Sequence, residues 1–228
     1  MRRIQFGSWV FFELSDPDSH IPFNSWHQLE YLPTVKTIES VSSSAMWVVS
    51  PDCRDYSLIR DSKFADVQYI WGVLIDDDAD SFESDLERID ANSLDQIQSK
   101  LSLTERLRMI GRHCESSAST RTQISDKAIS YRPHLGIFVV VEAGAPIHEP
   151  LIGLPGVAGS SQFGPNEVGS EQPEFVTVYW LDDDPVDIAL ALIKALRDQG
   201  EAARNVVYAT TAETIYPWEW DWFEECRS

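Results

Sequence analysis

The segment Phe175–Gly200 constrains the fold more than any other part of the 228-residue chain. It opens with an apolar run, continues through three aspartates and then carries apolar residues at helical spacing. Asp184 suits an N-cap, Pro185 the first helical position, and Gly200 a left-handed residue after the last turn. A second apolar run, Val206–Thr210, follows. A strand–helix–strand order of this kind predicts two parallel strands joined by a right-handed crossover.

The stretch Val178–Gly200 resembles the opening of a response-regulator receiver domain, in which a strand ends in acidic residues that hold magnesium. The resemblance covers about a tenth of the chain. A receiver domain also needs a phosphate-accepting aspartate and a lysine farther along, and no lysine follows Gly200. We therefore interpret this stretch as a well-capped strand–helix turn and not as part of a receiver domain.

Four other apolar runs predict further strands. They are Phe6–Leu14, Met46–Val49, Val67–Ile75 and Leu135–Val141. The last is continuously apolar, which is typical of a strand buried on both faces. The chain is therefore expected to belong to the α/β (or α+β) class, with a mixed sheet, packed helices and a βαβ-like unit over residues 175–210.

Helical spacing of apolar residues recurs between Ser81 and His113, and Ser102 suits the cap of a second helix in this region. Residues 20–45 contain two prolines and show no clear period, so we predict irregular structure there. We predict a single α/β domain over residues 1–228. The Ser/Thr-rich loop 116–130 leaves open a division into two lobes, 1–115 and 131–228.

One pattern occurs twice, namely an aromatic strand followed by three aspartates and a helix. The two copies are Tyr69–Leu86 and Val178–Ile193. A duplication would place both aspartate triplets at the same edge of one sheet. Chance recurrence is the alternative, because acidic residues are favoured near helix N-termini. Consecutive aspartates diverge, whereas Mg²⁺ and Ca²⁺ need oxygen ligands that converge on one point. We predict no metal site and no cofactor.

The charge balance is strongly acidic, with 18 Lys and Arg against 37 Asp and Glu and a net charge of −19. Such a balance disfavours direct binding to nucleic acid or anionic lipid and favours a basic protein partner. No apolar run is long enough to span a bilayer. The three dispersed cysteines, Cys53, Cys114 and Cys226, indicate neither a disulfide framework nor a zinc site. We expect a soluble protein of the cytoplasm.

Alternating tryptophans and acids distinguish the C-terminal segment Tyr216–Glu225. In an extended strand, Trp218, Trp220 and Trp222 would share one face, opposite Glu219 and Asp221. The strand could pack its indoles on the core. Alternatively, it could present an exposed aromatic and acidic patch that suits a partner rich in Lys and Arg.

No zincin, nucleophile-elbow or Walker A motif occurs, so we predict a protein that is not an enzyme. The leading hypothesis is a binding protein that neutralises a basic partner, most plausibly an immunity protein or inhibitor of a nucleic-acid-directed toxin. The predicted partner-binding residues are Asp76, Asp77, Asp78, Asp80, Asp182, Asp183, Trp218, Glu219, Trp220, Asp221 and Trp222. Two alternatives remain open: a metal-dependent hydrolase or transferase that uses the aspartate triplets, and a regulatory or structural subunit of a larger complex.

Overall fold

The computed structural model describes residues 3–93, 103–144, 146, 150–165, 174–216 and 222–223. The chain divides into two compact units, which are described separately below. The first unit comprises residues 1–46, 66–110 and 215–228, and the second comprises residues 47–65 and 111–214. Both units combine antiparallel strands with helices, which confirms the predicted α/β (or α+β) class.

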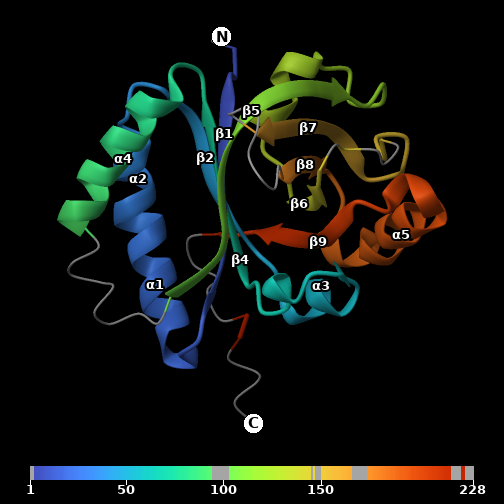
Figure 1. Cartoon of the computed structure of the whole chain (residues 1–228), viewed down its shortest axis with the longest axis horizontal. Helices are drawn as coiled ribbons and strands as arrows, with labels where there is room; N and C mark the ends of the chain where they lie inside the picture. Colours follow the sequence, from blue (N-terminus) through green and yellow to red (C-terminus); the bar gives the residue numbers. More distant parts are fainter. Residues whose placement is uncertain are drawn as a thin grey trace. The chain divides into compact units, whose positions relative to one another are not determined.

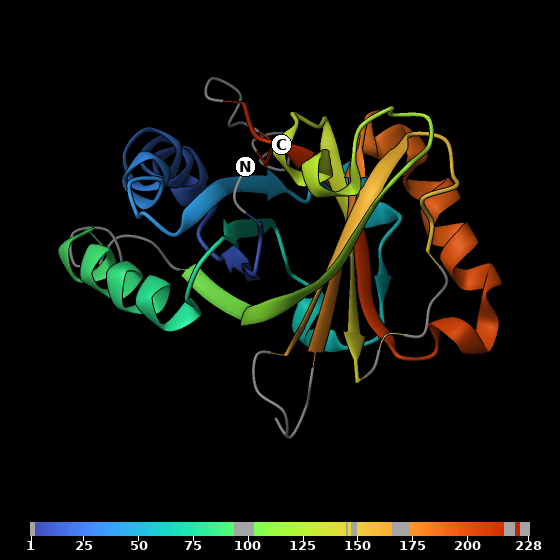
Figure 2. The same cartoon turned by 90° about the horizontal axis from the view of Figure 1, so that it is seen from above.

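The first unit has the connectivity of a ferredoxin-like fold. Its elements are β1 (Phe6–Leu14), α1 (His20–Trp26), η2 (His27–Tyr31), α2 (Leu32–Val35), β2 (Val41–Val48), β4 (Tyr69–Ile75), α4 (Ala79–Ser93) and the start of β5 (Leu103–Ala118). The strands lie in the order β2-β4-β1-β5, and β1 is antiparallel to β4. Helices α1, α2 and α4 cover one face of these strands (Figures 1 and 2).

The stretch α1–η2–α2 is helical where the sequence predicted irregular structure, so that prediction was wrong. Pro22 lies in the first turn of α1, where a backbone N–H is not needed. Pro33 lacks the N–H that would continue an α-helix, and here the helix widens into a π-turn. In that turn the Leu32 N–H donates to the His27 carbonyl. Two prolines therefore mark an irregularity within one continuous helical segment.

The structure corrects a second prediction at residues 103–118, which form strand β5 and not a helix. The local sequence is rich in helix-favouring residues, but β5 completes the sheet beside β1. Arg106 of β5 forms an ion pair with Glu13 of β1. Tertiary pairing has overridden local helix propensity in this segment.

The second unit repeats the ferredoxin-like strand order, with a further strand at each of its two edges. Its elements are the end of β5, β6 (Gly136–Ala143), β7 (Val157–Pro165), β8 (Glu174–Leu181), α5 (Pro185–Asp198) and β9 (Val206–Thr214), with the short α3 (Pro51–Asp55), β3 (Leu58–Ile59) and η4 (Asp126–Tyr131). The strand order is β5-β7-β8-β6-β9-β3. In the described part of the β6–β7 connection there is no helix, whereas the first unit has α1–η2–α2 at the corresponding place.

The predicted strand–helix–strand unit is confirmed. Strands β8 and β9 are both antiparallel to β6, which lies between them, so they run parallel to each other. The Asp184 carboxylate caps α5 by accepting from the Val186 N–H at 2.9 Å. Gly200 follows the helix with φ +56°, the left-handed conformation expected for it.

Three short 3-10 turns complete the described elements. They are η1 (Pro17–Ser19), η3 (Ser62–Phe64) and η5 (Gly200–Ala203). Within the residues that the structure describes, no helix is long and apolar enough to cross a membrane.

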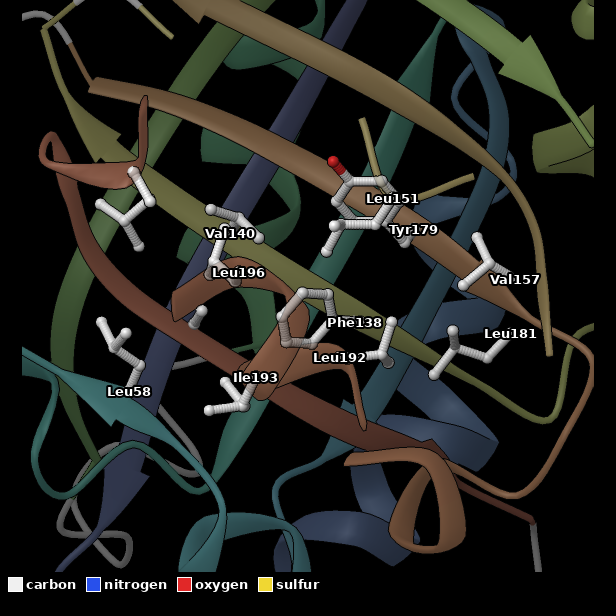
Figure 3. Close-up of a cluster of buried hydrophobic side chains, with 13 residues drawn as sticks. Leu58, Phe138, Val140, Leu151, Val157, Tyr179, Leu181, Leu192, Ile193 and Leu196 are labelled. Atoms are coloured by element: carbon white, nitrogen blue, oxygen red, sulfur yellow. The ribbon is translucent and has the colours of Figure 1, made fainter. Parts of the chain in front are cut away.

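An apolar layer fills the space between α5 and the sheet of the second unit (Figure 3). Its side chains come from both sides, with Leu192 and Leu196 of α5 packing onto Phe138 and Tyr179 of the strands. Leu151, from the β6–β7 connection, enters the same layer. These side chains are at most 5% exposed, so this layer is a closed hydrophobic core.

Candidate functional site

The corresponding layer of the first unit differs, because it contains buried polar side chains among its aromatic and aliphatic ones. We call it the polar layer and define it as His20, Asn24, His27 and Gln28 of α1–η2 together with Tyr69 and Trp71 of β4. Helical spacing brings the four helix residues to one side of the helix, and Tyr69 and Trp71 share a face of β4. Asn24 and Tyr69 are 0% exposed, so these groups have left water completely.

The Tyr69 hydroxyl is the hydrogen-bonding centre at one end of the polar layer. It accepts from Asn24 Nδ2 at 3.0 Å and lies 2.8 Å from His20 Nδ1. Burial raises the pKa of Tyr69, so the phenol keeps its proton. Which of the two atoms, the Tyr69 oxygen or His20 Nδ1, donates in the second bond depends on the tautomer of His20. The Phe223 ring stacks on His20 with centroids 4.4 Å apart.

His27 is the chemically unusual member of the polar layer. Its side chain is 3% exposed, yet neither Nδ1 nor Nε2 has a hydrogen-bond partner. The Asn24 Oδ1 atom is likewise buried without a partner. A buried polar atom without a partner costs about 1–3 kcal/mol, and native proteins contain few of them. Packing alone does not explain why several buried polar atoms without partners lie in one layer.

Aromatic rings surround the imidazole of His27. The centroids of Phe23, Trp26, Tyr31 and Trp71 lie between 5.5 and 6.2 Å from that of His27. Burial, with a smaller contribution from the Lys36 charge, lowers the pKa of His27 to about 3. The ring is therefore neutral at physiological pH, and one nitrogen offers an unused lone pair.

A second helix is tied to this site through Tyr31. The Tyr31 hydroxyl donates to Asp90 Oδ1 of α4 at 2.6 Å, and the Tyr31 ring contacts both His27 and Trp71. Burial raises the pKa of Asp90 and, with the Asp90 charge, that of Tyr31. Tyr31 consequently stays protonated and remains a hydrogen-bond donor.

Each of the other described histidines has a hydrogen-bond partner for at least one ring nitrogen. His113 Nε2 lies 2.8 Å from Ser116 Oγ. His134 Nε2 donates to the Ile129 carbonyl at 2.8 Å, and its ring stacks on Trp180. His148 lies outside the described residues. Among the histidines that the structure describes, only His27 has both ring nitrogens buried and free.

The first aspartate triplet has mainly structural contacts. Asp76 Oδ2 accepts from Ser42 Oγ at 2.8 Å. Asp78 caps α4 by accepting from the N–H groups of Asp80 and Ser81. Asp77 and Asp80 are exposed.

The second triplet, in the second unit, also has mainly structural contacts. Asp182 pairs with Arg132 at 3.0 Å, Asp183 packs against Gly156, and Asp184 caps α5. Each triplet follows the third strand of a ferredoxin-like unit, which is the equivalence that a duplication predicts.

The remaining predicted partner-binding residues are in the C-terminal segment. Trp222 is half-buried. Trp218, Glu219, Trp220 and Asp221 lie outside the described residues. Binding of a basic protein to these positions or to the aspartates stays a prediction.

Within the described ranges, no group of three or more His, Cys, Asp or Glu side chains lies close enough to hold a metal ion. The aspartate triplets therefore do not form the metal site on which the hydrolase or transferase alternative depended.

The sequence matches no family model, and no curated protein matches it. Solved structures share its fold over nearly the whole chain. A mutant chlorite dismutase from Candidatus Nitrospira defluvii, solved with cyanide, is 9% identical, with 99% of this chain and 95% of that chain covered and a TM-score of 0.54.

Dye-decolorizing peroxidase structures have similar identities, coverages and TM-scores. The enzyme from Bacteroides thetaiotaomicron is 6% identical, with 99% and 96% covered and a TM-score of 0.54. A variant of DypB from Rhodococcus jostii RHA1, in complex with heme, is 8% identical, with 94% of each chain covered and a TM-score of 0.56. At these identities the likeness establishes the fold alone.

This likeness overturns the functional predictions made from charge. The immunity-protein or toxin-inhibitor hypothesis is wrong, as is the prediction that the chain is not an enzyme, because its fold is that of chlorite dismutases and dye-decolorizing peroxidases. For the same reason we do not retain the interpretation as a non-catalytic subunit. The net charge of −19 describes a well-solvated surface and did not identify the function.

The polar layer itself was missed at the level of sequence because residues 20–45 were predicted to be irregular. A usable signal was present: His20, Asn24, His27 and Tyr31 recur at spacings of four, three and four. Such spacing is helical. The two prolines obscured it.

Proposed function

We propose that this chain is a heme-dependent enzyme in which His27 is the iron ligand. One observation carries the proposal: a fully buried, neutral imidazole has both nitrogens free of hydrogen-bond partners. Neutral imidazole is the form that coordinates iron. The fold likeness to heme-binding DypB supports the choice of metal group, in contrast to the expectation of no cofactor.

The residues of the first unit fit such a group by their chemistry. A pKa of about 3 keeps the His27 lone pair available at every pH above that value. Phe23, Trp26 and Trp71 surround the imidazole with aromatic rings, and such linings are typical of cofactor sites. The second unit does not fit, because closely packed side chains fill its helix–sheet layer and none of them is a histidine.

The side chains of the polar layer would have different roles at the site. His27 would fix the iron through one ring nitrogen and offer an N–H at the other. Asn24 Oδ1, which has no partner, would accept a hydrogen bond from whatever donor enters the layer. Heme supplies a redox-active iron, which no side chain offers. The surrounding aromatic rings would exclude water.

In the structure, the rings around His27 pack directly against it. Binding therefore requires α1–η2–α2 to move away from β4. The π-turn at His27–Tyr31 is a suitable place for such movement, because π-turns interrupt regular helical hydrogen bonding and recur at functional sites.

We also propose that the protein works in the cytoplasm. Cys53 and Cys114 are both free thiols, and Cys114 is exposed. Free exposed thiols suit a reducing compartment.

Titration of the purified protein with hemin tests the proposed function. We expect a saturable Soret shift with one equivalent bound, and loss of that shift in His27→Ala. His113→Ala, which removes a half-buried histidine of β5, is the matched control and should bind as the wild type does.

Two results would contradict the proposal. The first is the absence of saturable binding by the wild-type protein. The second is an unchanged Soret band in His27→Ala, since the iron would then be held elsewhere.

A further inference from the structure

Access to His27 is controlled by how α1–η2–α2 is held against its neighbours. The His27 side chain is 3% exposed, so no molecule larger than water reaches it in this arrangement. Tyr31, one turn further along the helix, is 6% exposed and packs against His27, Trp26 and Trp71. Any opening of the layer at this end must displace the Tyr31 ring.

We propose that the hydrogen bond from Tyr31 to Asp90 is a latch that keeps the polar layer closed, and that its release admits the ligand to His27. This inference rests on the proposed function for the identity of the ligand. Tyr31 is a positioning residue in it, because it acts through His27 and the rings around it.

The geometry and chemistry of the pair suit a latch. The donor–acceptor distance of 2.6 Å is typical of a strong O–H···O⁻ bond. The bond joins two separate helical segments of the first unit, η2 and α4, which Figures 1 and 2 show on the same face of the sheet. Hydrogen bonds to charged groups contribute more to stability than neutral ones, but far less than a whole core. Such a bond can therefore break without unfolding the unit.

Three charged residues around the latch act on the Asp90 carboxyl. Arg108 of β5 lies close enough to Asp90 to oppose the rise in the pKa of that carboxyl, while Glu105 and Glu87 act in the opposite direction. Arg108 itself pairs with Glu105 at 2.5 Å. The latch thus faces one guanidinium and two carboxylates, from β5 and α4.

The test measures how fast diethyl pyrocarbonate modifies each histidine at pH 7.5, followed by peptide mass spectrometry and needing no heme. Tyr31→Phe keeps the ring and removes only the hydroxyl. We expect modification of His27 to accelerate about ten- to a hundredfold, with His113 unchanged. Tyr56→Phe, which alters a partly exposed tyrosine of the second unit, is the matched control and should leave both rates unchanged.

Asp90→Ala should accelerate modification of His27 to a similar degree, and the double variant should be no faster than either single one. An unchanged His27 rate in Tyr31→Phe would overturn the latch. So would an equal acceleration at His113, since that result indicates general loss of stability.

Hemin binding separates this inference from the proposed function. If the latch is correct, Tyr31→Phe should bind hemin with a faster association rate and the same final spectrum. If the wild-type protein binds no hemin, the proposed function fails, and the modification rates still decide whether the latch exists.

Discussion

The two units of this protein use one strand order and two different kinds of interior. In the second unit, apolar side chains such as Phe138 and Leu196 fill the layer between helix and sheet. In the first unit the equivalent layer contains His20, Asn24 and His27, with buried polar atoms that have no partners. Because unsatisfied polar groups destabilise a protein, stability alone does not explain the polar layer, whereas it does explain the apolar layer.

The largest expected effect concerns the apolar layer. Phe138→Ala removes a fully buried ring and should lower the free energy of unfolding by about 3–5 kcal/mol in urea denaturation. Hemin binding by the folded fraction should be unchanged. Loss of hemin binding in a variant that remains folded would break the division of roles between the two units.

In the polar layer, by contrast, a substitution should raise the stability of the protein at low pH. The pKa of His27 is lowered from 6.5 to about 3, so the unfolded chain binds a proton below pH 6.5 that the folded chain does not. This difference in proton binding costs about 1.4 kcal/mol of stability for each pH unit between 6.5 and 3 and nothing above 6.5.

Replacing His27 by phenylalanine should abolish this pH-dependent loss of stability. At pH 5 we expect the variant to be more stable than the wild type by about 2 kcal/mol, with a smaller difference at pH 7.5. Thermal unfolding of the two proteins across this pH range is the measurement. A variant that is less stable at both pH values would show that the His27 ring is an ordinary part of the core.

The smallest expected effect tests whether the two aspartate triplets are equivalent. The third aspartate of each caps a helix: Asp184 accepts at 2.9 Å, while Asp78 accepts at 3.2 and 3.4 Å. Replacing either by alanine should cost about 1 kcal/mol, with Asp184→Ala the more costly. Asp77→Ala, at an exposed position, should change stability by less than about 0.5 kcal/mol. If Asp77→Ala and Asp78→Ala lowered stability equally, Asp78 would not act as a helix cap.

The sequence allowed a better prediction of the second unit than of the first, for physical reasons. The cap at Asp184 and the left-handed Gly200 are local features, so the helix between them could be recognised from adjacent residues alone. Strand β5 and the helix after His20 depend on distant pairing and on how a helix accommodates Pro33, and local propensity contradicted both.

The site could not be predicted from residue types. Its chemical character comes from burial of His27 without a partner, which only the packed layer reveals. Charge, the most conspicuous property of the sequence, led instead to a basic partner and to an incorrect function. Helical spacing of His20, Asn24 and His27 was the sequence signal that pointed to the right segment.

Rescue of a His27→Gly variant by imidazole tests the central claim most directly. The glycine removes the ring and leaves a space that free imidazole can fill, without changing any other member of the polar layer. The account predicts that His27→Gly loses the Soret shift seen with wild-type protein and hemin, and that millimolar imidazole restores the wild-type spectrum. A wild-type Soret band in His27→Gly before imidazole is added would contradict the claim that His27 holds the iron.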